Sequence, residues 1–559
     1  MTVTLGQLAE LVGGSVLPAG TVPGDPGAGG VTDGVNGAAG ADGSDVSDPA
    51  ISGVSLNAAE TPEGGLFAAL PGTRVHGASY ADQSPGVAVL TDHAGLEIFG
   101  EKGALERPVL LVDDVRAVLG FVSAEIYGHP SEKLTVIGVT GTSGKTTTTY
   151  LLEAALLASG RRTGLIGTTG TRINGRAVPS HLTTPEAPAL QRLFAEMVDE
   201  GVTHVVMEVS SHALSLGRVD GVGFDVTCFL NLSQDHLDFH DGLDDYFNAK
   251  ARLFRPDSPL HAPRVVSCVD DSWGARMAEL AAADDVTVDT VATPHAEDAT
   301  TADDGSRVAP KATWRAHDVS VADNGVQYVT LTGPSGSVQL EVPLPGAFNI
   351  ANAAVAWAAL AAAGVAGSEA ASGIASVAVP GRMQRIDEGQ DFLAVVDYAH
   401  KPAAIGEVLR TLRAQTVGRL IAVVGAGGDR DASKRPLMGA EAARVADVVI
   451  VTDDNPRTED PTLIRRAVTA GAVEAAEKRS AEVGIDAIRV EDIGDRAEAI
   501  DVAIRLAEPG DAVVVAGKGH ETGQEINGVQ HPFDDREQVR AALRRRAESG
   551  EAGEGTVED

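Results

Sequence analysis

A glycine-rich loop between a strand-like run and a helical pattern is the feature that most constrains the fold of this chain. An apolar run at residues 134–140 leads into GTSGKTT at residues 141–147, and an Ala/Leu-rich helical pattern follows. Glycines allow backbone N–H groups to close around phosphate, and the helix N-terminus adds a favourable dipole. We expect Lys145 to reach the terminal phosphates and the Thr146 hydroxyl to bind Mg²⁺. Val139 stands where the first glycine of the usual spacing would fall, so a chance glycine-rich turn is the alternative.

Strand-like apolar runs alternate with helical patterns along most of the chain. Examples are THVVMEVSS, RLIAVVGAGG, ADVVIVTDDN and DAVVVAGKGH. Continuous apolar strands separated by helices are typical of parallel sheets covered on both faces, so we predict an α/β fold. The runs fall into two groups, which together with the N-terminal region predict three domains at residues 1–132, 133–379 and 380–559. Ligands of such sheets bind beyond the carboxyl ends of the strands.

Three segments contain too few apolar residues to offset the entropy of ordering them. Residues 18–50 are rich in Gly, Ala, Asp and Pro and are predicted to form a flexible insertion. Residues 293–311 are predicted to form a surface loop. Residues 547–559 form an acidic tail that we expect to fray.

The composition excludes several classes of function. The formal net charge of −35 argues against nonspecific binding to nucleic acid or to anionic membranes, which requires positive surface. Two cysteines, Cys228 and Cys268, supply neither a disulfide framework nor a Cys-rich zinc site. The N-terminus lacks the basic and apolar regions of a signal peptide, and no apolar stretch has membrane-spanning length. We therefore expect a soluble cytoplasmic protein without membrane insertion.

Two residues downstream of the loop are candidate metal ligands. Glu208 interrupts the apolar run of one strand, and His236 follows another apolar run, CFLNL. Both are expected at the strand ends where Thr146 lies, and Mg²⁺ takes oxygen ligands readily and a histidine occasionally. An ordinary surface position is the alternative for each of them.

A lysine lies on the apolar face of a predicted helix. In DDYFNAKARLF, Lys250 shares one face with Tyr246, Leu253 and Phe254 at helical spacing. A side chain that extends to solvent along the helix surface is the alternative. A buried lysine tends to lose its proton, and a neutral amine can react with CO₂ to give a carbamate. Because a carbamate is an anionic oxygen ligand, this reaction would turn a cation into a magnesium ligand.

The stretch VVIVTDDNPRTEDP at residues 448–461 ends a buried strand in polar residues. Asn455 followed by Pro456 is typical of a turn, so a polar loop is the simplest interpretation from this stretch alone. Arg457 directly after such a strand is the feature that this interpretation leaves without a role.

These motifs together resemble those of the Mur ligase family. In chain order they are TGT-x-GKT, E-V-S-S-H, N-L-x-x-D-H-L-D, A-K-x-x-L-F, P-G-R-M, D-Y-A-H, G-G-D-R-D-x-x-K-R, D-N-P-R and G-K-G-H-E, and they span about residues 51–545. The resemblance implies a three-domain α/β architecture with a central P-loop ATPase domain and a Rossmann-like C-terminal domain. It also implies an ATP-dependent ligation in peptidoglycan precursor synthesis, in which the carboxylate of UDP-N-acetylmuramoyl-L-alanyl-D-glutamate is phosphorylated and an amino acid attacks the acyl-phosphate.

The resemblance further implies roles for individual residues. ATP contacts are expected from Gly141, Thr142, Ser143, Gly144, Lys145, Thr146, Thr147, Asn349, Arg382, Asp397, Tyr398 and His400. Contacts to the UDP-linked dipeptide are expected from Leu56, Thr183, Thr184, Ser210 and Arg218. One Mg²⁺ is expected on Thr146 and Glu208, a second on His236 and carbamylated Lys250, and the catalytic set is Lys145, Glu208, His236 and Lys250. Amino-acid contacts are expected from Arg430, Asp454, Asn455, Pro456, Arg457, Gly517 and Glu521.

The D-N-P-R motif bears on which amino acid is added. The distal centre of meso-diaminopimelate carries an ammonium and a carboxylate, whereas that of lysine carries only an ammonium. Arg457 offers a planar fork that matches a carboxylate, Arg430 would bind a carboxylate too, and Glu521 would take the ammonium. Gly517 leaves room for close approach, and an arginine would repel an incoming lysine ammonium. We therefore predict meso-diaminopimelate, with L-lysine or another diamino acid as alternatives.

Three other interpretations remain open. A folylpolyglutamate synthetase-like ligase shares the loop and a modified lysine, although D-N-P-R with G-K-G-H-E does not suit it. A catalytically inactive Mur-like binding protein is disfavoured by the intact Lys145, Glu208, His236 and Lys250. A P-loop motor or GTPase would lack a lysine on an apolar helix face. The expected partners are small molecules only, and we expect a monomer.

Overall fold

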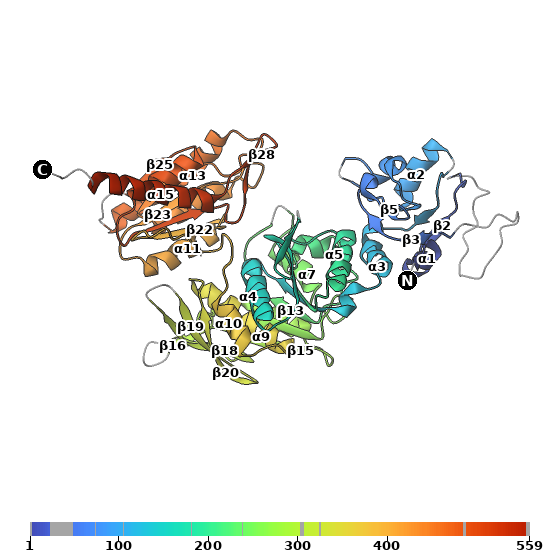
Figure 1. The fold of residues 1–559 in the computed structure, drawn as a ribbon, viewed down its shortest axis with the longest axis horizontal. Coiled ribbons are helices and arrows are strands. Elements are labelled where there is room, and N and C mark those ends of the chain that lie inside the picture. The colour runs from blue at the N-terminus through green and yellow to red at the C-terminus, as the bar shows by residue number, and fades with distance from the viewer. Residues whose placement is uncertain are drawn as a thin grey trace.

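The computed structural model describes residues 3–22, 48–72, 74–103, 105–179, 182–236, 239–301, 307–322, 326–483 and 488–554. Most of the predicted insertion at 18–50, the middle of the predicted loop at 293–311 and the last residues of the predicted tail lie outside this set. The described residues form three main sheets, one after another along the chain. They are coloured blue, teal to yellow, and orange to red in Figure 1.

The first sheet has the strand order β2-β7-β6-β5-β4, with β2 antiparallel to β7 and the other neighbours parallel. Its core is built from Leu, Val and Ala side chains of the strands and of helices α1 and α3. The strands are β2 (Ser15–Leu17), β4 (Val54–Ser55), β5 (Leu66–Ala68), β6 (Ala88–Thr91) and β7 (Val109–Leu111), with the small pair β1 (Val3–Thr4) and β3 (Ala50–Ile51) beside them. The helices are α1 (Leu5–Val12), α2 (His93–Lys102) and α3 (Val115–Ile126).

The second sheet has eleven strands in the order β11-β10-β9-β12-β8-β13-β14-β15-β18-β19-β20. The strands are β8 (Thr135–Thr140), β9 (Thr163–Gly167), β10 (Gly170–Ile173), β11 (Arg176–Val178), β12 (His204–Glu208), β13 (Val226–Phe229), β14 (Arg264–Cys268), β15 (Thr287–Ala292), β18 (Trp314–Val321), β19 (Gln327–Gly333) and β20 (Gly336–Val342). The helices are α4 (Lys145–Ala158), α5 (Ala187–Asp199), α6 (Ser211–Ser215), α7 (Leu243–Ala251), α8 (Ser272–Ala281), α9 (Ala347–Ala362) and α10 (Ser368–Ala375). A separate short pair, β16 (Thr300–Thr301) and β17 (Arg307–Val308), lies in the predicted surface loop.

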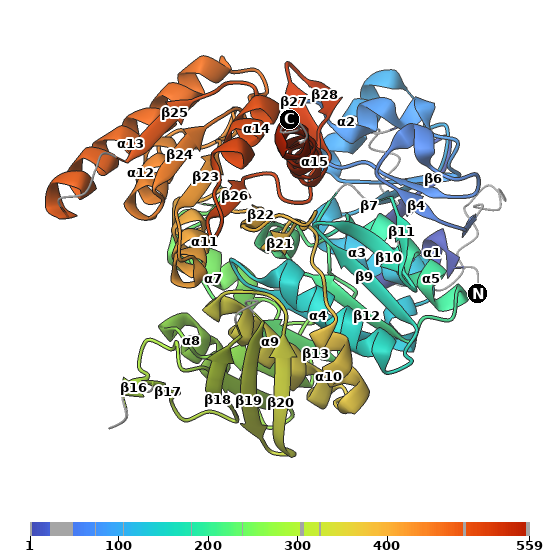
Figure 2. The ribbon, with the colours of Figure 1, turned by 60° about the vertical axis from the view of Figure 1, so that its left-hand side comes forward.

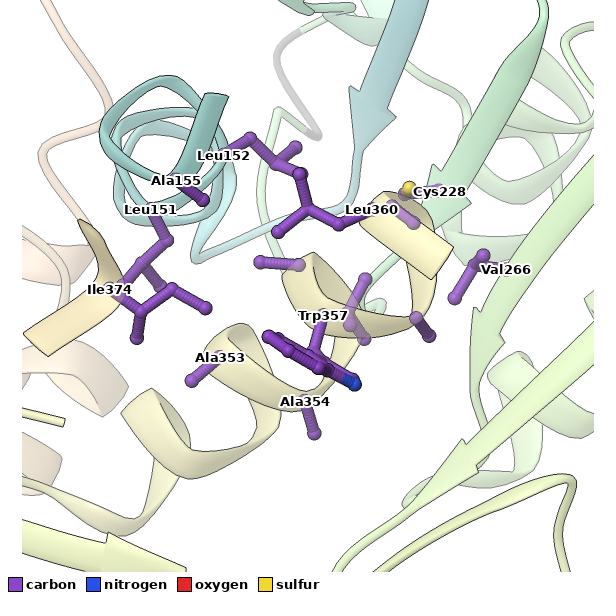
Figure 3. Close-up of a cluster of buried hydrophobic side chains, with 14 of the residues drawn as sticks. Leu151, Leu152, Ala155, Cys228, Val266, Ala353, Ala354, Trp357, Leu360 and Ile374 are labelled. Atoms are coloured by element: carbon purple, nitrogen blue, oxygen red, sulfur yellow. The ribbon is translucent and has the colours of Figure 1, made fainter. Parts of the chain in front are cut away.

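Helix α9 packs against the middle of this sheet and against α4. Trp357 and Leu360 of α9 are buried in one cluster with Leu151 and Leu152 of α4, as Figure 3 shows. The many alanines of α9 allow this helix to approach its neighbours closely. The cluster therefore holds α4, and with it the glycine-rich loop, firmly on the sheet.

The third sheet has the order β21-β22-β26-β23-β24-β25, with only β21 antiparallel to its neighbour. The strands are β21 (Gln384–Arg385), β22 (Leu393–Asp397), β23 (Leu420–Val424), β24 (Val448–Val451), β25 (Arg489–Asp492) and β26 (Ala512–Ala516), and the hairpin β27 (Gly523–Ile526) and β28 (Val529–Pro532) follows. The helices are α11 (Pro402–Gln415), α12 (Lys434–Val445), α13 (Pro461–Val483), α14 (Arg496–Leu506) and α15 (Asp535–Glu554). Helix α15 continues through Glu554, and residues 555–559 of the predicted tail lie outside the described residues.

The predicted α/β fold is confirmed, with parallel strands in the middle of each sheet. The sequence analysis does not predict the antiparallel edges. Strands β18 and β19 alternate between buried and less buried positions, so one face of that edge is not covered by helices, which antiparallel strands tolerate. None of the helices in the described part of the chain is both long and apolar enough to cross a membrane.

Candidate active site

A cleft of about 1150 Å³ lies between the carboxyl ends of the strands of the second and third sheets. Figure 2 shows the third sheet, in orange and red, beside the second. The predicted site residues that line the cleft are Thr142, Ser143, Gly144, Lys145, Thr146, Thr147, Thr183, Thr184, Glu208, Ser210, Arg218, His236, Asn349, Arg382, Asp397, Tyr398, His400, Arg430, Asp454, Asn455, Arg457, Gly517 and Glu521.

Four predicted residues do not line this cleft. Leu56 follows β4 of the first sheet and packs against the core there, so the structure does not bring it to the other site residues. Gly141 contributes its backbone carbonyl, which accepts hydrogen bonds from two lysines. Lys250 lies behind the loop, and Pro456 shapes the turn between two lining residues.

The glycine-rich loop turns into α4 at Gly144, which has a φ of 86°. A side chain there would be strained, and its Cβ would lie 2.3 Å from Oδ1 of Asn352. Lys145 is the first residue of α4, and its Nζ donates to the carbonyls of Gly141 at 2.8 Å and Thr142 at 3.1 Å. Burial lowers the pKa of Lys145 to about 8. An incoming phosphate would restore its full charge, so the amine is held where an anion is required.

Glu208 lies at the end of β12, in register with Val139 of β8, and this pairing places it beside the loop. Its carboxylate is buried and accepts hydrogen bonds from the Thr146 hydroxyl at 2.9 Å and from the backbone N–H and hydroxyl of Thr168 at 2.8 and 3.1 Å. The Nη2 of Arg382, from the third sheet's segment, lies 3.5 Å from the same Thr146 hydroxyl. Thus one hydroxyl, one carboxylate and one guanidinium meet at the start of α4.

Lys250 is 1% exposed on α7, which excludes a side chain extended into solvent. Its Nζ donates to the carbonyl of Gly141 at 3.0 Å and lies 3.5 Å from Oγ1 of Thr140 and 4.4 Å from the centre of the Tyr246 ring. Burial, and then repulsion from Lys145, hold its pKa well below the ordinary value. The amine is therefore directed at the loop, and its lowered pKa favours the neutral form, which is the form that reacts with CO₂.

His236 stands next to an ion pair that joins the second and third sheets. Its backbone has a φ of 52°, its Nε2 lies 3.0 Å from Oδ2 of Asp235, and burial lowers its pKa to about 4. Asp235 also pairs with Lys401, which precedes α11. Burial alone would raise the pKa of Asp235, but Lys401 and His236 outweigh it and lower that pKa to about 2. The carboxylate is thus kept charged between two basic groups.

The oxygen atoms at the loop suit a magnesium ion. Thr146 and Glu208 present a hydroxyl and a carboxylate, the donor types that Mg²⁺ prefers. Among the described residues, no group of three or more His, Cys, Asp or Glu side chains is arranged to hold a metal. Lys250 in its amine form donates hydrogen bonds and cannot serve as an anionic ligand. The predicted second ion on His236 and Lys250 therefore requires the carbamate.

The wall towards the first sheet carries the predicted dipeptide contacts. The Thr184 hydroxyl accepts from the backbone N–H of Ser210 at 3.2 Å, and Ser210 caps the N-terminus of α6. Arg218 lies 2.8 Å from a carboxylate oxygen of Glu186 and 3.4 Å from the carbonyl of Thr184. Thr183 lies beside them in the same lining. These hydroxyls and this guanidinium form a polar surface next to the phosphate loop.

The segment of the third sheet and helix α9 carry further predicted nucleotide contacts. The guanidinium of Arg382 stacks over the ring of Tyr398 at 4.3 Å. The Nδ1–H of His400 donates to the carbonyl of Tyr398 at 2.8 Å, and burial lowers the pKa of His400 to about 4. The carboxylate of Asp397 accepts the backbone N–H groups of Met383 and Ala399, both at 2.7 Å, and so joins the turn after β22 to the segment before β21. Asn349 donates to a backbone carbonyl at 2.7 Å, so its amide orientation is fixed as well.

Arg457 follows β24 and is about one-quarter exposed, with a backbone φ of 51°. Its Nη1 donates to the carbonyl of Gly428 at 2.7 Å, and its Nε lies 3.3 Å from Oε2 of Glu525. Arg430 is exposed and lies on the loop after β23 that lines the same part of the cleft. Arg430 and Arg457 therefore both line this end of the cleft.

The acidic side of this end is formed after β24 and β26. Asn455 donates from Nδ2 to Oε2 of Glu521 at 2.9 Å, and its Oδ1 accepts from Nζ of Lys518 at 2.8 Å. Burial, and then the nearby Asp454, raise the pKa of Glu521. Gly517 has a φ of 123°, and a Cβ there would contact Asp454 at 3.4 Å. A ligand ammonium would therefore be favoured beside Glu521.

Several residues that matter to the site escape the sequence analysis. Lys518 has an unexposed side chain, and the only hint in the sequence is a lysine between two glycines directly after an apolar strand. Asp235 and Lys401 pair across 166 positions of sequence. Arg496 and Asp535 form an ion pair with both side chains unexposed. Nothing in the patterns of α14 and α15 distinguishes these two from surface charges.

Comparison with known proteins agrees with this geometry. The Mur ligase middle domain matches residues 139–360, and the glutamate ligase domain of Mur ligases matches residues 381–519. The chain is 59% identical over 499 residues to the UDP-N-acetylmuramoyl-L-alanyl-D-glutamate--2,6-diaminopimelate ligase of Corynebacterium glutamicum, covering 88% of this chain and 92% of the relative. It is 47% identical over 500 residues to the enzyme of the same name from Streptomyces coelicolor, covering 89% and 93%.

Solved structures show the same architecture. The solved structure of a UDP-N-acetylmuramoyl-L-alanyl-D-glutamate--2,6-diaminopimelate ligase matches at a TM-score of 0.60 and 33% identity. The match covers 89% of this chain and 96% of the chain in that structure. The folylpolyglutamate synthase of Mycobacterium tuberculosis matches at a TM-score of 0.54 and 20% identity, covering 76% and 93%, which indicates a shared fold alone. The chain belongs to the Mur ligase family. The resemblance of its motifs to that family is thereby confirmed.

Proposed function

We propose that this protein is an ATP-dependent ligase that joins meso-diaminopimelate to UDP-N-acetylmuramoyl-L-alanyl-D-glutamate during peptidoglycan precursor synthesis. The observation that carries the proposal is a single cleft with a phosphate-binding loop at one end and paired guanidinium and carboxylate groups at the other. The names of the relatives, which share up to 59% of their residues over most of both chains, agree with this substrate pair.

Each of the three sheets would belong to a domain that binds a different substrate. We assign residues 1–132 to a domain for the UDP-linked substrate, 133–379 to the ATP-binding domain and 380–559 to the amino-acid domain. The phosphate loop and Glu208 lie on the second, and Arg457 lies on the third. Leu56 would contact the uridine part within the first domain, away from the reacting groups.

The reaction begins with two anions that repel each other. The dipeptide carboxylate must attack the terminal phosphorus of ATP, so cations must hold them together. Lys145 would exchange its two loop carbonyls for phosphate oxygens. Attack forms an acyl-phosphate and releases ADP; the amine then displaces phosphate, and its extra proton passes to solvent.

Mg²⁺ would neutralise charge on the phosphates when bound. Thr146 and Glu208 would hold one ion, and His236 with the Lys250 carbamate would hold the other. The buried amine of Lys250, which lies next to the carbonyl of Gly141 and has a lowered pKa, supports the modification. Its new carboxylate would also compensate the positive charge of Lys145 nearby.

Closure of the third sheet over the second would protect the acyl-phosphate from water. Arg382 lies 3.5 Å from the Thr146 hydroxyl, and Lys401 pairs with Asp235, so both cross between the two parts. Excluding water also strengthens every charge interaction within the cleft. Tyr398 would hold Arg382 in place through the stacked contact.

The end of the cleft that carries Arg457 would bind both charged groups at the distal centre of meso-diaminopimelate. Arg457 and Arg430 would bind the carboxylate, and Glu521 would bind the ammonium beside the open backbone of Gly517. L-lysine, which lacks that carboxylate, would leave both guanidinium groups without a ligand carboxylate to bind. The same contacts argue against a folylpolyglutamate synthetase-like activity and against an inactive binding protein.

The deciding experiment measures ATP-dependent phosphate release with a panel of meso-diaminopimelate, L-lysine and L-ornithine. Turnover should require the UDP-linked dipeptide and should be fastest with meso-diaminopimelate. Absence of turnover with every diamino acid would refute the ligase proposal. A preference for L-lysine would overturn the assignment of meso-diaminopimelate as the substrate. We also propose that the protein acts as a monomer in the cytoplasm, which light scattering and cell fractionation would test.

A further inference from the structure

We propose that Lys518 is a positioning residue that fixes which way the Asn455 amide faces, and through it the preference for a substrate carboxylate. The inference rests on the proposed function of this end of the cleft. Lys518 itself is unexposed and does not line the cleft, so it acts through its neighbours.

The ammonium of Lys518 is surrounded by oxygen atoms. Its Nζ donates to Oδ1 of Asn455 and to the carbonyl of Gly523, both at 2.8 Å. It lies 3.3 Å from Oδ1 of Asp454 and 3.6 Å from Oε2 of Glu521. Every one of these partners is an acceptor, so an ammonium is the group that this position requires.

The amide of Asn455 has four hydrogen-bonding positions, and the structure occupies three of them. Both acceptor positions on Oδ1 are filled, by Lys518 and by the backbone N–H of Glu525 at 3.0 Å. One N–H of Nδ2 donates to Glu521 at 2.9 Å. One N–H donor is left, and Asn455 lines the cleft.

This arrangement makes Asn455 a donor towards the ligand. A flipped amide would place an NH₂ group against the ammonium of Lys518 and the backbone N–H of Glu525, which are both donors. The flipped state would also turn the oxygen towards Glu521. With the orientation fixed, the remaining N–H favours a carboxylate, as Arg457 does. Glu521 accepts one hydrogen bond from Asn455 and keeps further acceptor positions for an ammonium.

Nearby charges hold the Lys518 ammonium in this position. Its Nζ is within ion-pair distance of Asp454 and Glu521, and the guanidinium of Arg496 is a second cation that acts on the same two carboxylates. The attraction of the carboxylates keeps the ammonium against Oδ1 of Asn455, which is the contact that fixes the amide.

The test uses the full-length protein and steady-state kinetics with three variants. Lys518→Met removes the ammonium at nearly constant length and should raise KM for meso-diaminopimelate about 10- to 100-fold, the cost of unsatisfied buried groups. KM for ATP should stay within about twofold. The ratio of kcat/KM for meso-diaminopimelate over L-lysine should fall by at least about tenfold. Lys478→Met, an exposed lysine on α13, is the matched control and should change none of these values.

A double-mutant cycle separates positioning from general destabilisation. If Lys518 acts through Asn455, Lys518→Met in an Asn455→Ala background should change KM for meso-diaminopimelate by less than about twofold. Additive effects would overturn the proposal, as would an unchanged KM or equal rises in KM for ATP and meso-diaminopimelate in folded Lys518→Met. If Lys518→Met does not fold, Lys518→Gln takes its place, because glutamine retains an N–H donor but not the charge. The same outcomes would then overturn the proposal: additive effects in the cycle, or a KM for meso-diaminopimelate that is unchanged or rises equally with KM for ATP. Failure of the wild type to use meso-diaminopimelate would instead refute the proposed function.

Discussion

Lys250→Met separates the chemistry of this lysine from its contribution to stability. Methionine has a similar length and no charge, so it fills the same buried space on α7. The variant loses one hydrogen bond to the carbonyl of Gly141, a cost of about 0.5–1.5 kcal/mol. That carbonyl keeps its second donor, Lys145, at 2.8 Å. The loss should therefore fall at the lower end of this range.

The same substitution removes a cost that the folded protein bears. An amine buried without full compensation costs about 1–3 kcal/mol, and methionine avoids it. The two effects oppose each other, so the free energy of unfolding of Lys250→Met should lie within about 2 kcal/mol of the wild type. Lys250→Ala, in contrast, opens a cavity and should lose about 2–5 kcal/mol.

Activity should respond very differently. If the carbamate of Lys250 supports phosphoryl transfer, Lys250→Met should lower kcat by at least about 10²–10³-fold, the usual effect of losing one preorganised charged group. The assay is phosphate release, with urea unfolding measured on the same samples. Lys133→Met, an exposed lysine in a short 3₁₀ turn, is the control and should keep full activity.

Two further measurements make the reasoning refutable. Acetate should partly restore activity to Lys250→Ala, because a short carboxylate can enter the cavity, but not to Lys250→Met, which has none. Wild-type protein in ¹³C-bicarbonate should show a carbamate carbon resonance that Lys250→Met lacks. Full activity in Lys250→Met, or a loss of activity that only parallels a loss of stability, would refute the role.

Three other predictions follow from the site and its surroundings. Arg457→Lys keeps the charge but loses the planar fork, so KM for meso-diaminopimelate should rise about tenfold while KM for ATP stays within about twofold; equal rises would contradict the assignment. The free energy of unfolding should fall as pH is lowered from 6.5 towards 4, because burial lowers the pKa of His400 and His520 to about 4 and the unfolded chain binds those protons first. Urea titrations across this pH window measure how steeply the free energy of unfolding changes with pH, and His520→Gln should reduce that slope. A free energy of unfolding that does not change with pH would count against neutral buried imidazoles. Asp535→Asn leaves the unexposed guanidinium of Arg496 without its counter-charge, so urea unfolding should show a loss of about 3–5 kcal/mol, and a loss below about 1 kcal/mol would show that the pair is compensated elsewhere.

The part of the site that lies at strand ends was predictable from local patterns. An apolar run sets where a parallel strand stops, and the residues that follow must lie at one edge of the sheet. Glu208 and the loop at 141–147 come together for this reason, through the register of β12 and β8. Arg457 is placed by the end of β24 in the same way. The roles assigned to these residues remain predictions that the experiments above address.

The pairing of buried polar side chains was not predictable, because it depends on how elements pack across long stretches of sequence. Lys518 and Asn455 are 63 residues apart, and Arg496 and Asp535 are 39 apart. In the sequence, Lys518, Arg496 and Asp535 each look like ordinary surface charges, and no pattern links Lys518 to the amide of Asn455. Leu56 shows another limit: the resemblance assigned it to the UDP-linked substrate, but only the structure shows that it packs in the first sheet's core and does not line the cleft.

The glycines after β23 connect these two kinds of residue. Strand β23 lies between β24 and β26, so the loop that leaves it runs between the segments that carry Asn455 and Lys518. A Cβ at Gly425 would lie 2.8 Å from the carbonyl of Thr452, and one at Gly428 would lie 2.0 Å from the carbonyl of Pro456. Side chains there would force the loop away from the end of β24. The sequence GAGG therefore does for the proposed amino-acid end what Gly144 does for the proposed phosphate end: the absence of side chains allows the neighbouring segments to approach closely, as one shared ligand would require.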